Sequence, residues 1–296
     1  MIDFIRIFYK DKDRFEQHVV DEQNFPDLNA VLNYHTGSIK YPYTTNLGSL
    51  ALGVSEKTGY VKNSIHQLYN YLTEEAAHNH NDFGYYSICS TIDFISKKII
   101  DANITKLTQL EFGFNLDVDK DPVSILTRNF LTHQYKEGSV IDYQSKGKLK
   151  QFVHSNYIIK IYDKSRQYNL GNNILRFEVK FKKAVEYKHL GIYSITDLKK
   201  KIVLRKLFIY LINRFDELTI VDNFSIQSIQ NKEEYYSLSR YSNPVFWTHE
   251  IKNTHSEYKA RKRKHFERLL KKNNLLKTKS QLRELLHRKF IYLINN

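Results

Sequence analysis

The chain has 296 residues, 41% of them hydrophobic and 26% charged, which excludes a disordered polypeptide and leaves room for one large domain or two smaller ones. One cysteine, Cys89, excludes an internal disulfide framework, and the lack of a secretory signal or of an apolar run near the ~20 residues that span a bilayer predicts a cytoplasmic protein. The formal net charge of +14 favours a polyanionic partner over a basic one.

The N-terminal part of the chain is expected to form strands with short helices between them. Residues 1–9 and 47–54 have the apolar character of strands. Residues 86–100 instead repeat isoleucine at helical spacing, with Ser87 as a candidate N-cap. This mixture of periods predicts a domain that contains both helices and strands.

Three later segments alternate apolar and polar residues with the period of a strand. They are residues 109–117, 158–164 and 174–182. A period of two predicts a sheet with one buried face and one open face. Between the second and third segments, Gly171-Asn172-Asn173 is expected to form a hairpin turn.

The last third of the chain changes to helical periodicity. Helices are expected over residues 197–215, with Asp197 as a cap, and over residues 256–272 and 279–294. The expected fold class is therefore α+β, with an antiparallel β-sheet and flanking helices followed by a basic helical C-terminal region.

The positive charge is concentrated at the end of the chain. Residues 251–296 carry a net charge of +11, so the preceding residues hold only +3 of the total. A block this basic favours contacts with nucleic-acid phosphates over a merely solvated helix face. We expect a catalytic domain over residues 1–200 and a DNA-binding region over residues 201–296.

If the three alternating segments are neighbours, their polar faces bring together a set of side chains with a chemical use. These are Glu111, Tyr162, Lys164, Arg176 and Glu178. A tyrosine can attack a phosphodiester once its phenolate is stabilised, and two carboxylates can hold Mg²⁺ or Mn²⁺, which prefer oxygen ligands. Spacing alone leaves two other interpretations open, a tyrosine that packs on its strand and carboxylates that form ion pairs.

Five short sequences occur in an order that is typical of one group of proteins. They are the Met-Ile-Asp start, His-Asn-x-Phe-Gly at residues 80–84, Glu111, Tyr162-x-Lys164 and Arg176-Phe177-Glu178. In this order they resemble the replication initiators of filamentous phages and rolling-circle plasmids, which nick one strand of their origin. The resemblance covers roughly residues 1–200.

The resemblance implies a sheet related to the HUH-type nicking endonucleases, in which Tyr162 forms a covalent 5′-phosphotyrosine with help from Lys164. It also implies that Glu111 and Glu178 bind Mg²⁺ or Mn²⁺. The chain departs from the family pattern because it lacks two histidines around a hydrophobic residue on a strand. His78-Asn79-His80 has a polar centre in a loop-like context, so His154 is the candidate for a third ligand.

Basic residues on the third strand and in the C-terminal region are expected to contact the DNA backbone. They are Arg176, Lys180, Lys182, Lys259, Arg261, Lys262, Arg263 and Lys264. The implied partners are origin DNA, single-stranded or as a supercoiled duplex, and a host helicase. The protein itself is expected to be a monomer or a homodimer.

Three other functions stay open at this point. Glu178-Val179-Lys180 has the spacing of nucleases in which a metal activates water, with Glu111 or Asp163 as the second carboxylate. The basic C-terminal region would also suit a DNA-binding regulator without catalysis. The 22 tyrosines could stack on single-stranded bases, although the three strands carry no outward aromatic pair.

Overall fold

The protein is described here by a computed structural model, which covers residues 1–144 and 146–296. Within those residues, ten strands form one antiparallel sheet in the order β2-β3-β4-β5-β1-β6-β12-β11-β10-β9. The strands are β1 (Ile2–Tyr9), β2 (Asn29–Leu32), β3 (Ile39–Leu47), β4 (Leu50–Val54), β5 (Gly59–Ser64), β6 (Lys106–Asp117), β9 (Ser139–Asp142), β10 (Lys148–Val153), β11 (Tyr157–Asp163) and β12 (Ile174–Phe181). A smaller sheet joins β13 (Leu218–Ile220), β7 (Phe130–His133) and β8 (Lys136–Glu137).

Helices precede, connect and follow these strands. They are α1 (Lys12–Val20), α2 (Ile65–Glu74), α3 (Tyr85–Lys98), α4 (Pro122–Arg128), α5 (Lys164–Tyr168), α6 (Val185–Lys188), η1 (Ile195–Lys199), α7 (Lys201–Asp216), α8 (Lys232–Ser242), η2 (Phe246–Glu250), α9 (Ser256–Lys272) and α10 (Lys277–Asn295). The fold class is therefore α+β, as the sequence predicts. None of the helices in the described residues combines the length and the apolar composition that a bilayer crossing requires.

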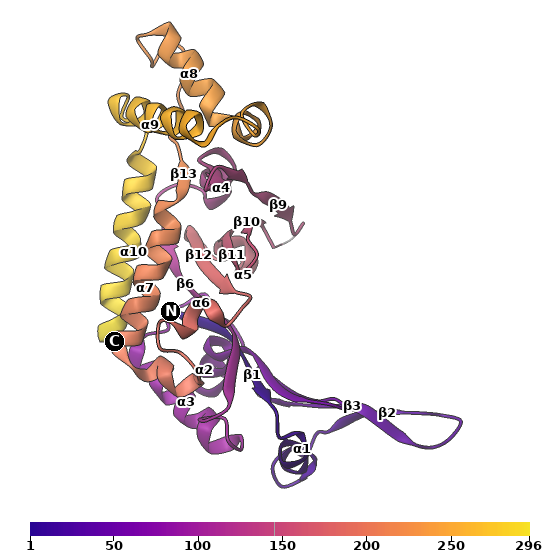
Figure 1. The fold of residues 1–296 in the computed structure, drawn as a ribbon. Coiled ribbons are helices and arrows are strands. Elements are labelled where there is room, and N and C mark those ends of the chain that lie inside the picture. Colours follow the sequence, from indigo (N-terminus) through magenta and orange to yellow (C-terminus); the bar gives the residue numbers. More distant parts are fainter. Residues whose placement is uncertain (145) are drawn as a thin grey trace.

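The three alternating segments are neighbours in the large sheet, which is the condition that the proposed group of side chains requires. They form β6, β12 and β11, with β12 in the middle. Their apolar side chains are buried on one face, where α7 and α10 run side by side along the sheet (Figure 1). Phe114 of β6 packs edge-on against Phe208 of α7, whose ring stacks on Phe290 of α10 with the centroids 4.1 Å apart. Burial of these aromatic rings against two helices fixes which face of the sheet points to the core.

The polar face of β6 and β12 is covered around Asn115 and Arg176, contrary to the prediction of an open face. Asn115 of β6 donates from Nδ2 to the carbonyl oxygens of Asn79 and His80, at 3.2 and 3.0 Å. The segment between α2 and α3 therefore lies across this face. Its polar side chains are buried among hydrogen-bond partners instead of facing solvent.

The connection from β11 to β12 is not the expected hairpin turn. The Asp163 side chain accepts a hydrogen bond from the backbone N–H of Arg166 at 3.1 Å and so caps α5. A short helix then precedes Gly171-Asn172-Asn173. Because of this cap, Lys164 begins a helix and does not continue the strand.

Two further local predictions are corrected at helix starts. Ser87 does not cap α3, which begins at Tyr85 after Gly84. A side chain at Gly84 would meet the backbone of Asn296, which explains the glycine. Asp197 lies inside η1, where its carboxylate accepts from the backbone N–H of Ser194 at 3.0 Å. The other predicted helices are confirmed, and α9 has the predicted bounds.

A second, smaller core lies at the end of the molecule that carries α8 and α9 (Figure 1). It joins α8, η2 and α9 around Tyr241, Trp247 and Phe266. In contrast, α7 and α10 contribute to the main core, with Leu207 and Leu286 among their buried residues. The expected division at residue 200 therefore does not follow the cores. The smaller unit is inserted between two helices of the larger one.

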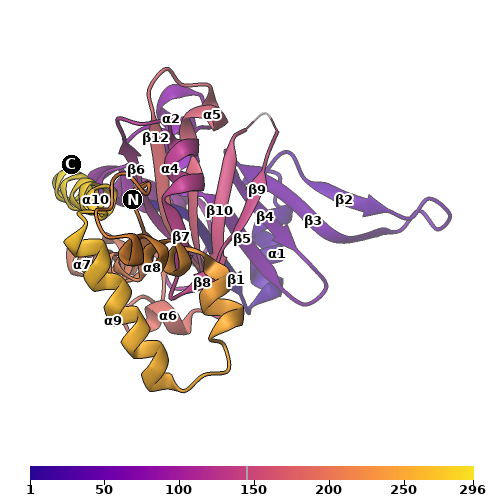
Figure 2. The ribbon, with the colours of Figure 1, turned by 90° about the horizontal axis from the view of Figure 1, so that it is seen from above.

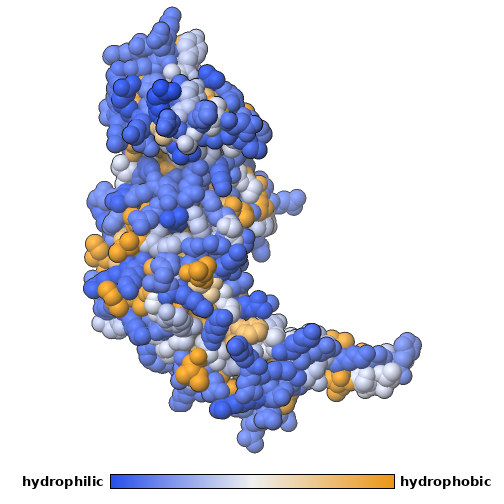
Figure 3. Space-filling model, viewed as in Figure 1, coloured by the Kyte–Doolittle hydropathy of each residue, from blue (hydrophilic) through white to orange (hydrophobic). Residues whose placement is uncertain are grey.

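The two ends of the molecule differ in surface character. The β2–β3 hairpin projects beyond the body in both ribbon views (Figures 1 and 2). Apolar side chains lie exposed on it, while the surface over α8 and α9 is mainly hydrophilic (Figure 3). The α9 part of the basic C-terminal region thus belongs to a compact unit with a polar exterior.

Candidate functional site

Tyr162 lies on β11 at a surface pocket of about 350 Å³. Lys160, Glu178 and Glu111 line the same pocket from three adjacent strands. The Tyr162 hydroxyl donates to Oε2 of Glu178 at 3.4 Å. Burial, and then the negative charge of Glu178, raises the pKa of Tyr162 well above its ordinary value. In this arrangement the phenol is held protonated and oriented toward a carboxylate.

The two carboxylates share one ammonium group. Nζ of Lys160 lies 3.0 Å from Oε1 of Glu178 and 3.1 Å from Oε1 of Glu111. The strand register causes this contact, because Lys160 pairs with Glu178 across β11 and β12. Lys180 pairs with Glu111 across β12 and β6. Its Nζ lies 3.0 Å from Oε1 of Glu111 and forms a second ion pair. Lys160 was not among the predicted site residues, although it alternates onto the Tyr162 side of β11.

The pKa values of the two carboxyl groups move in opposite directions. Burial opposes ionisation of Glu178, but Lys160 and Arg176 together hold its pKa below the ordinary value. Burial and the neighbouring charge of Glu178 raise the pKa of Glu111. Lys160 stays protonated, since the attraction of both carboxylates outweighs its burial and raises its pKa. The group therefore behaves as a coupled cluster with its charges largely compensated.

Arg176 is inside this cluster, only 3% exposed, so the prediction that it contacts the DNA backbone is corrected. Its guanidinium donates through Nε to Glu178 at 2.7 Å, through Nη1 to Oδ1 of Asn115 at 2.9 Å and through Nη2 to Oδ2 of Asp3 at 3.2 Å. Each of the three guanidinium nitrogens thus donates to a protein acceptor. Arg176 thereby holds in place the Glu178 carboxylate that accepts the hydrogen bond of the Tyr162 hydroxyl.

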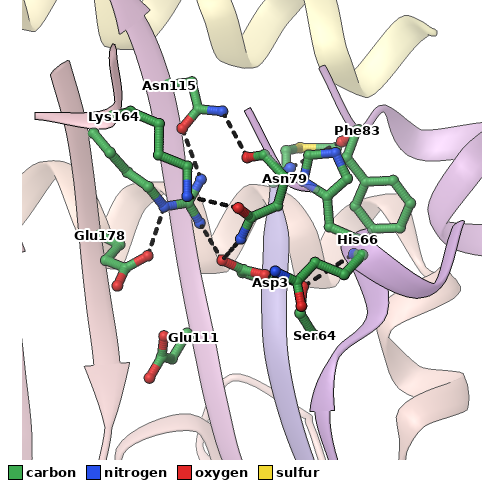
Figure 4. Close-up of polar contacts among 12 residues, drawn as sticks. Asp3, Ser64, His66, Asn79, Phe83, Glu111, Asn115, Lys164 and Glu178 are labelled. Carbon is green, nitrogen blue, oxygen red and sulfur yellow. Dashed lines mark hydrogen bonds and ion pairs between the residues drawn. The ribbon is translucent and has the colours of Figure 1, made fainter. Parts of the chain in front are cut away.

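A hydrogen-bonded network continues from Asp3 to Lys164 through Asn79 (Figure 4). Asn79 donates from Nδ2 to Oδ2 of Asp3 at 2.7 Å, and its Oδ1 accepts from Nζ of Lys164 at 2.6 Å and from the Tyr168 hydroxyl at 2.7 Å. Asn79 is thus the polar centre of the His78-Asn79-His80 sequence and the residue that reaches the site. The signal for Asp3 was the Met-Ile-Asp start, but its partners could not be read from the sequence.

Lys164 lies beside Tyr162, as predicted, but it is buried and belongs to α5 instead of the open face of the strand. Its Nζ lies 5.3 Å from the centre of the Tyr162 ring. Burial, reinforced by the charge of Arg176, lowers the pKa of Lys164 to about 7. Lys164 can therefore exist as an amine or as an ammonium near neutral pH.

His154 does not join the carboxylates, which corrects its assignment as a metal ligand. It follows β10 and its Nε2 lies 2.9 Å from Nδ1 of His133. Its ring stacks on Tyr157, which alternates onto the opposite face of β11 from Tyr162. Within the described residues, no group of three or more His, Cys, Asp or Glu side chains is arranged to hold a metal ion.

The remaining predicted basic residues lie apart from Tyr162. Lys182 is exposed at the end of β12, and its Nζ donates to the carbonyl of His154 at 3.1 Å. The five residues of the tail are all on α9. Arg261, Arg263 and Lys264 are exposed, while Lys259 and Lys262 are partly covered. α9 therefore presents a basic face to solvent and packs its other face on the smaller core.

No family model matches the chain, and no curated protein matches its sequence. Among solved structures, the chain is similar to the rolling circle replication initiator protein from Geobacillus stearothermophilus, with a TM-score of 0.43 and 13% identity over 79% of this chain and 89% of that one. A likeness this distant carries no inference about function. Any function must therefore be inferred from the side chains around Tyr162.

Proposed function

We propose that the protein nicks single-stranded DNA through Tyr162, as in the replication initiators that its sequence motifs resemble. The phenolic oxygen attacks a phosphorus atom while its proton passes to Glu178, which accepts its hydrogen bond. The bond from phosphorus to the 3′ oxygen breaks, the 3′ oxygen takes up a proton to become a hydroxyl, and the 5′ phosphate stays on the tyrosine. The observation that carries the proposal is a tyrosine hydroxyl at a surface pocket with cationic and carboxylate side chains beside it. Attack by a new 3′ hydroxyl would reverse the step without a nucleotide cofactor.

Each neighbour has a role in this proposal. Glu178 accepts the hydrogen bond of the hydroxyl and directs its oxygen toward the pocket. Lys164, beside the ring, stabilises negative charge on the phenolate or the phosphate. Arg176 and Asn79 position these two residues through the buried network.

A divalent metal fits only part of this arrangement. Glu111 and Glu178 offer oxygen ligands suited to Mg²⁺ or Mn²⁺, but the ammonium of Lys160 already bridges them. A dication could bind between the carboxylates only after Lys160 had moved, and His154 lies elsewhere. The roles assigned above therefore belong to side chains alone.

We assign duplex binding to α9. Its 17 residues include eight Lys or Arg and two Glu, so one exposed face is strongly basic. Phosphate contacts by such a face release counterions and strengthen binding at low salt. The inserted unit would then hold duplex DNA while the sheet acts on a single strand.

Incubation with single-stranded origin DNA, followed by a denaturing gel, tests the proposal. The wild-type protein should give a covalent protein–DNA band that Tyr162→Phe abolishes. Tyr193→Phe serves as the matched control, because Tyr193 is exposed and does not line the pocket. Parallel reactions with EDTA and with Mn²⁺ measure the metal requirement.

Two other outcomes would replace the proposal. Cleavage without an adduct that survives Tyr162→Phe would indicate a nuclease that activates water, with Glu178 and Lys180 as its residues. Binding of DNA with no cleavage under any condition would indicate a DNA-binding regulator that depends on α9.

A further inference from the structure

The pocket beside Tyr162 has a second wall formed by the β9–β10 hairpin. Tyr143, Lys146 and Lys148 line the pocket from this hairpin, opposite the carboxylates of β6 and β12. None of the three belongs to the cluster around Tyr162, and nothing in the nicking step as described uses them. Their position in the pocket suits a ligand that extends beyond the phosphodiester bond next to Tyr162.

The two walls differ in charge. The carboxylates on one wall are compensated by Lys160, Lys180 and Arg176. On the hairpin, Lys148 forms a long ion pair of 3.6 Å with Asp142, its one ion pair among the residues that the structure describes, and Lys146 is exposed. Both hairpin ammonium groups can therefore accept a phosphate without giving up a close internal partner.

Tyr143 supplies an aromatic surface at the rim of the pocket. Its side chain is 51% exposed, which leaves much of it available for contact. Its backbone N–H donates to the carbonyl of Gly147 at 3.0 Å, which ties Tyr143 to the residue that precedes β10. Gly147 has a φ of +83°, and a Cβ there would lie 3.1 Å from Cβ of Arg166 in α5. The glycine thus lets the hairpin approach α5 closely and keeps Tyr143 beside the pocket.

The size of the pocket limits what can enter. Its volume of about 350 Å³ is at the small end of the range for ligand pockets. One nucleotide fits such a space, whereas a stacked base pair does not. Phosphate-binding ammonium groups, an aromatic ring and the amide groups of Gln151 and Gln167 together match the parts of a nucleotide.

We infer that this pocket binds one nucleotide of single-stranded DNA next to the bond that Tyr162 would cleave. Tyr143 stacks on the base, Lys146 and Lys148 contact the phosphates, and Gln151 and Gln167 face the edge of the base. The position of the bound nucleotide relative to cleavage rests on the proposed function, but its binding does not.

Fluorescence anisotropy with a labelled oligodeoxythymidylate of about 20 nucleotides tests the site, since known single-strand sites cover ~4–16 nucleotides. The protein carries Tyr162→Phe, so no covalent product forms. Tyr143→Ala should weaken binding roughly 5- to 150-fold, the range expected for loss of one base stack, and Tyr143→Phe should retain it. Lys146→Gln and Lys148→Gln should each lower the salt slope by about 0.7.

Tyr193→Ala is the matched control, since Tyr193 is 60% exposed and does not line the pocket. A blunt duplex of the same length should bind with an affinity that Tyr143→Ala leaves unchanged, because α9 would hold it. Thermal unfolding that matches the parent shows that the variants are folded.

The results separate this inference from nicking. Unchanged affinity of Tyr143→Ala for the single strand overturns the inference, even where wild-type protein forms the adduct. Weakened affinity that Tyr143→Phe restores supports it, even where no adduct forms. Equal weakening for the duplex would also overturn it, since the pocket would then not select a single strand.

Discussion

Replacement of Lys160 by Met should expose how the two carboxylates of the site are held. The ammonium of Lys160 contacts both Glu178 and Glu111, at 3.0 and 3.1 Å. Removal of one partner from a buried ion pair costs about 3–5 kcal/mol. Here each carboxylate keeps another cation, Arg176 at 2.7 Å from Glu178 and Lys180 at 3.0 Å from Glu111. We therefore expect a loss of about 3 kcal/mol in the free energy of unfolding at pH 7, the low end of that range.

The loss should depend on pH in a defined direction. Without Lys160, the pKa of Glu111, already raised by burial and by Glu178, rises further. A carboxyl group whose pKa is higher in the folded state than in the unfolded state favours folding at low pH, and this contribution is lost as pH rises through the folded pKa. Lowering the pH from 7 to 5 should restore up to about 2.7 kcal/mol of the lost free energy of unfolding, the value for the uptake of one proton by the folded variant.

Mn²⁺ should raise the free energy of unfolding of the Lys160→Met protein but not that of the wild type. Once Lys160 is gone, Mn²⁺ can bind between the two carboxylates, and a concentration 100 times its Kd would add about 2.7 kcal/mol. Chemical unfolding with and without Mn²⁺ measures both effects. Lys182→Met, at an exposed lysine of the same sheet, is the control. A Lys160→Met protein as stable as wild type, or equal stabilisation of wild type by Mn²⁺, would refute the bridging role of Lys160.

Arg176→Ala should cost about 3–5 kcal/mol, because it leaves the buried carboxylates of Asp3 and Glu178 without their shared cation; urea unfolding measures this, and a cost below 1 kcal/mol would contradict the network. The pKa of Lys164 is lowered to about 7, so its burial penalty is relieved as pH rises from 7 toward 10.5. Wild type should therefore gain stability relative to Lys164→Met over that window, and parallel stability curves for the two proteins would exclude the shifted pKa. Lys264→Gln on α9 should weaken duplex binding for all sequences and shallow the salt slope by about one, whereas an unchanged slope would remove this residue from the interface.

The sequence predicted the three central strands because each strand alternates over its whole length. It could not predict that their polar face is covered, since the cover comes from distant parts of the chain. Asp3 reaches Arg176 only after β1 pairs with β6, and Asn79 reaches Asp3 only after the segment between α2 and α3 crosses the sheet. Period-two alternation distinguishes two faces of a sheet, but it does not say which face meets water.

The wrong predictions have one of two causes, a local helix cap or a tertiary contact. The cap by Asp163 was readable as an Asp before a helix-compatible run, and it competed with a strand pattern that extended one residue too far. His154 lies near Tyr162 in sequence, but its stack on Tyr157 shows that odd and even positions of β11 face opposite sides. The division at residue 200 followed the change of period, although both α7 and α10 return to the main core.

The insertion of the smaller core between α7 and α10 gives that unit two covalent attachments to the body. Residues 217–276 are connected to the body through β13 at one end and through α10 at the other. The start of α10 is held by Asp222, whose carboxylate accepts the backbone N–H of Lys277 at 2.7 Å. A unit joined at a single point can rotate about its linker, whereas two anchors permit far less rotation. The two attachments thus restrict how far the basic face of α9 can move relative to the Tyr162 pocket, which limits the spacing of two DNA contacts that the protein can make at once.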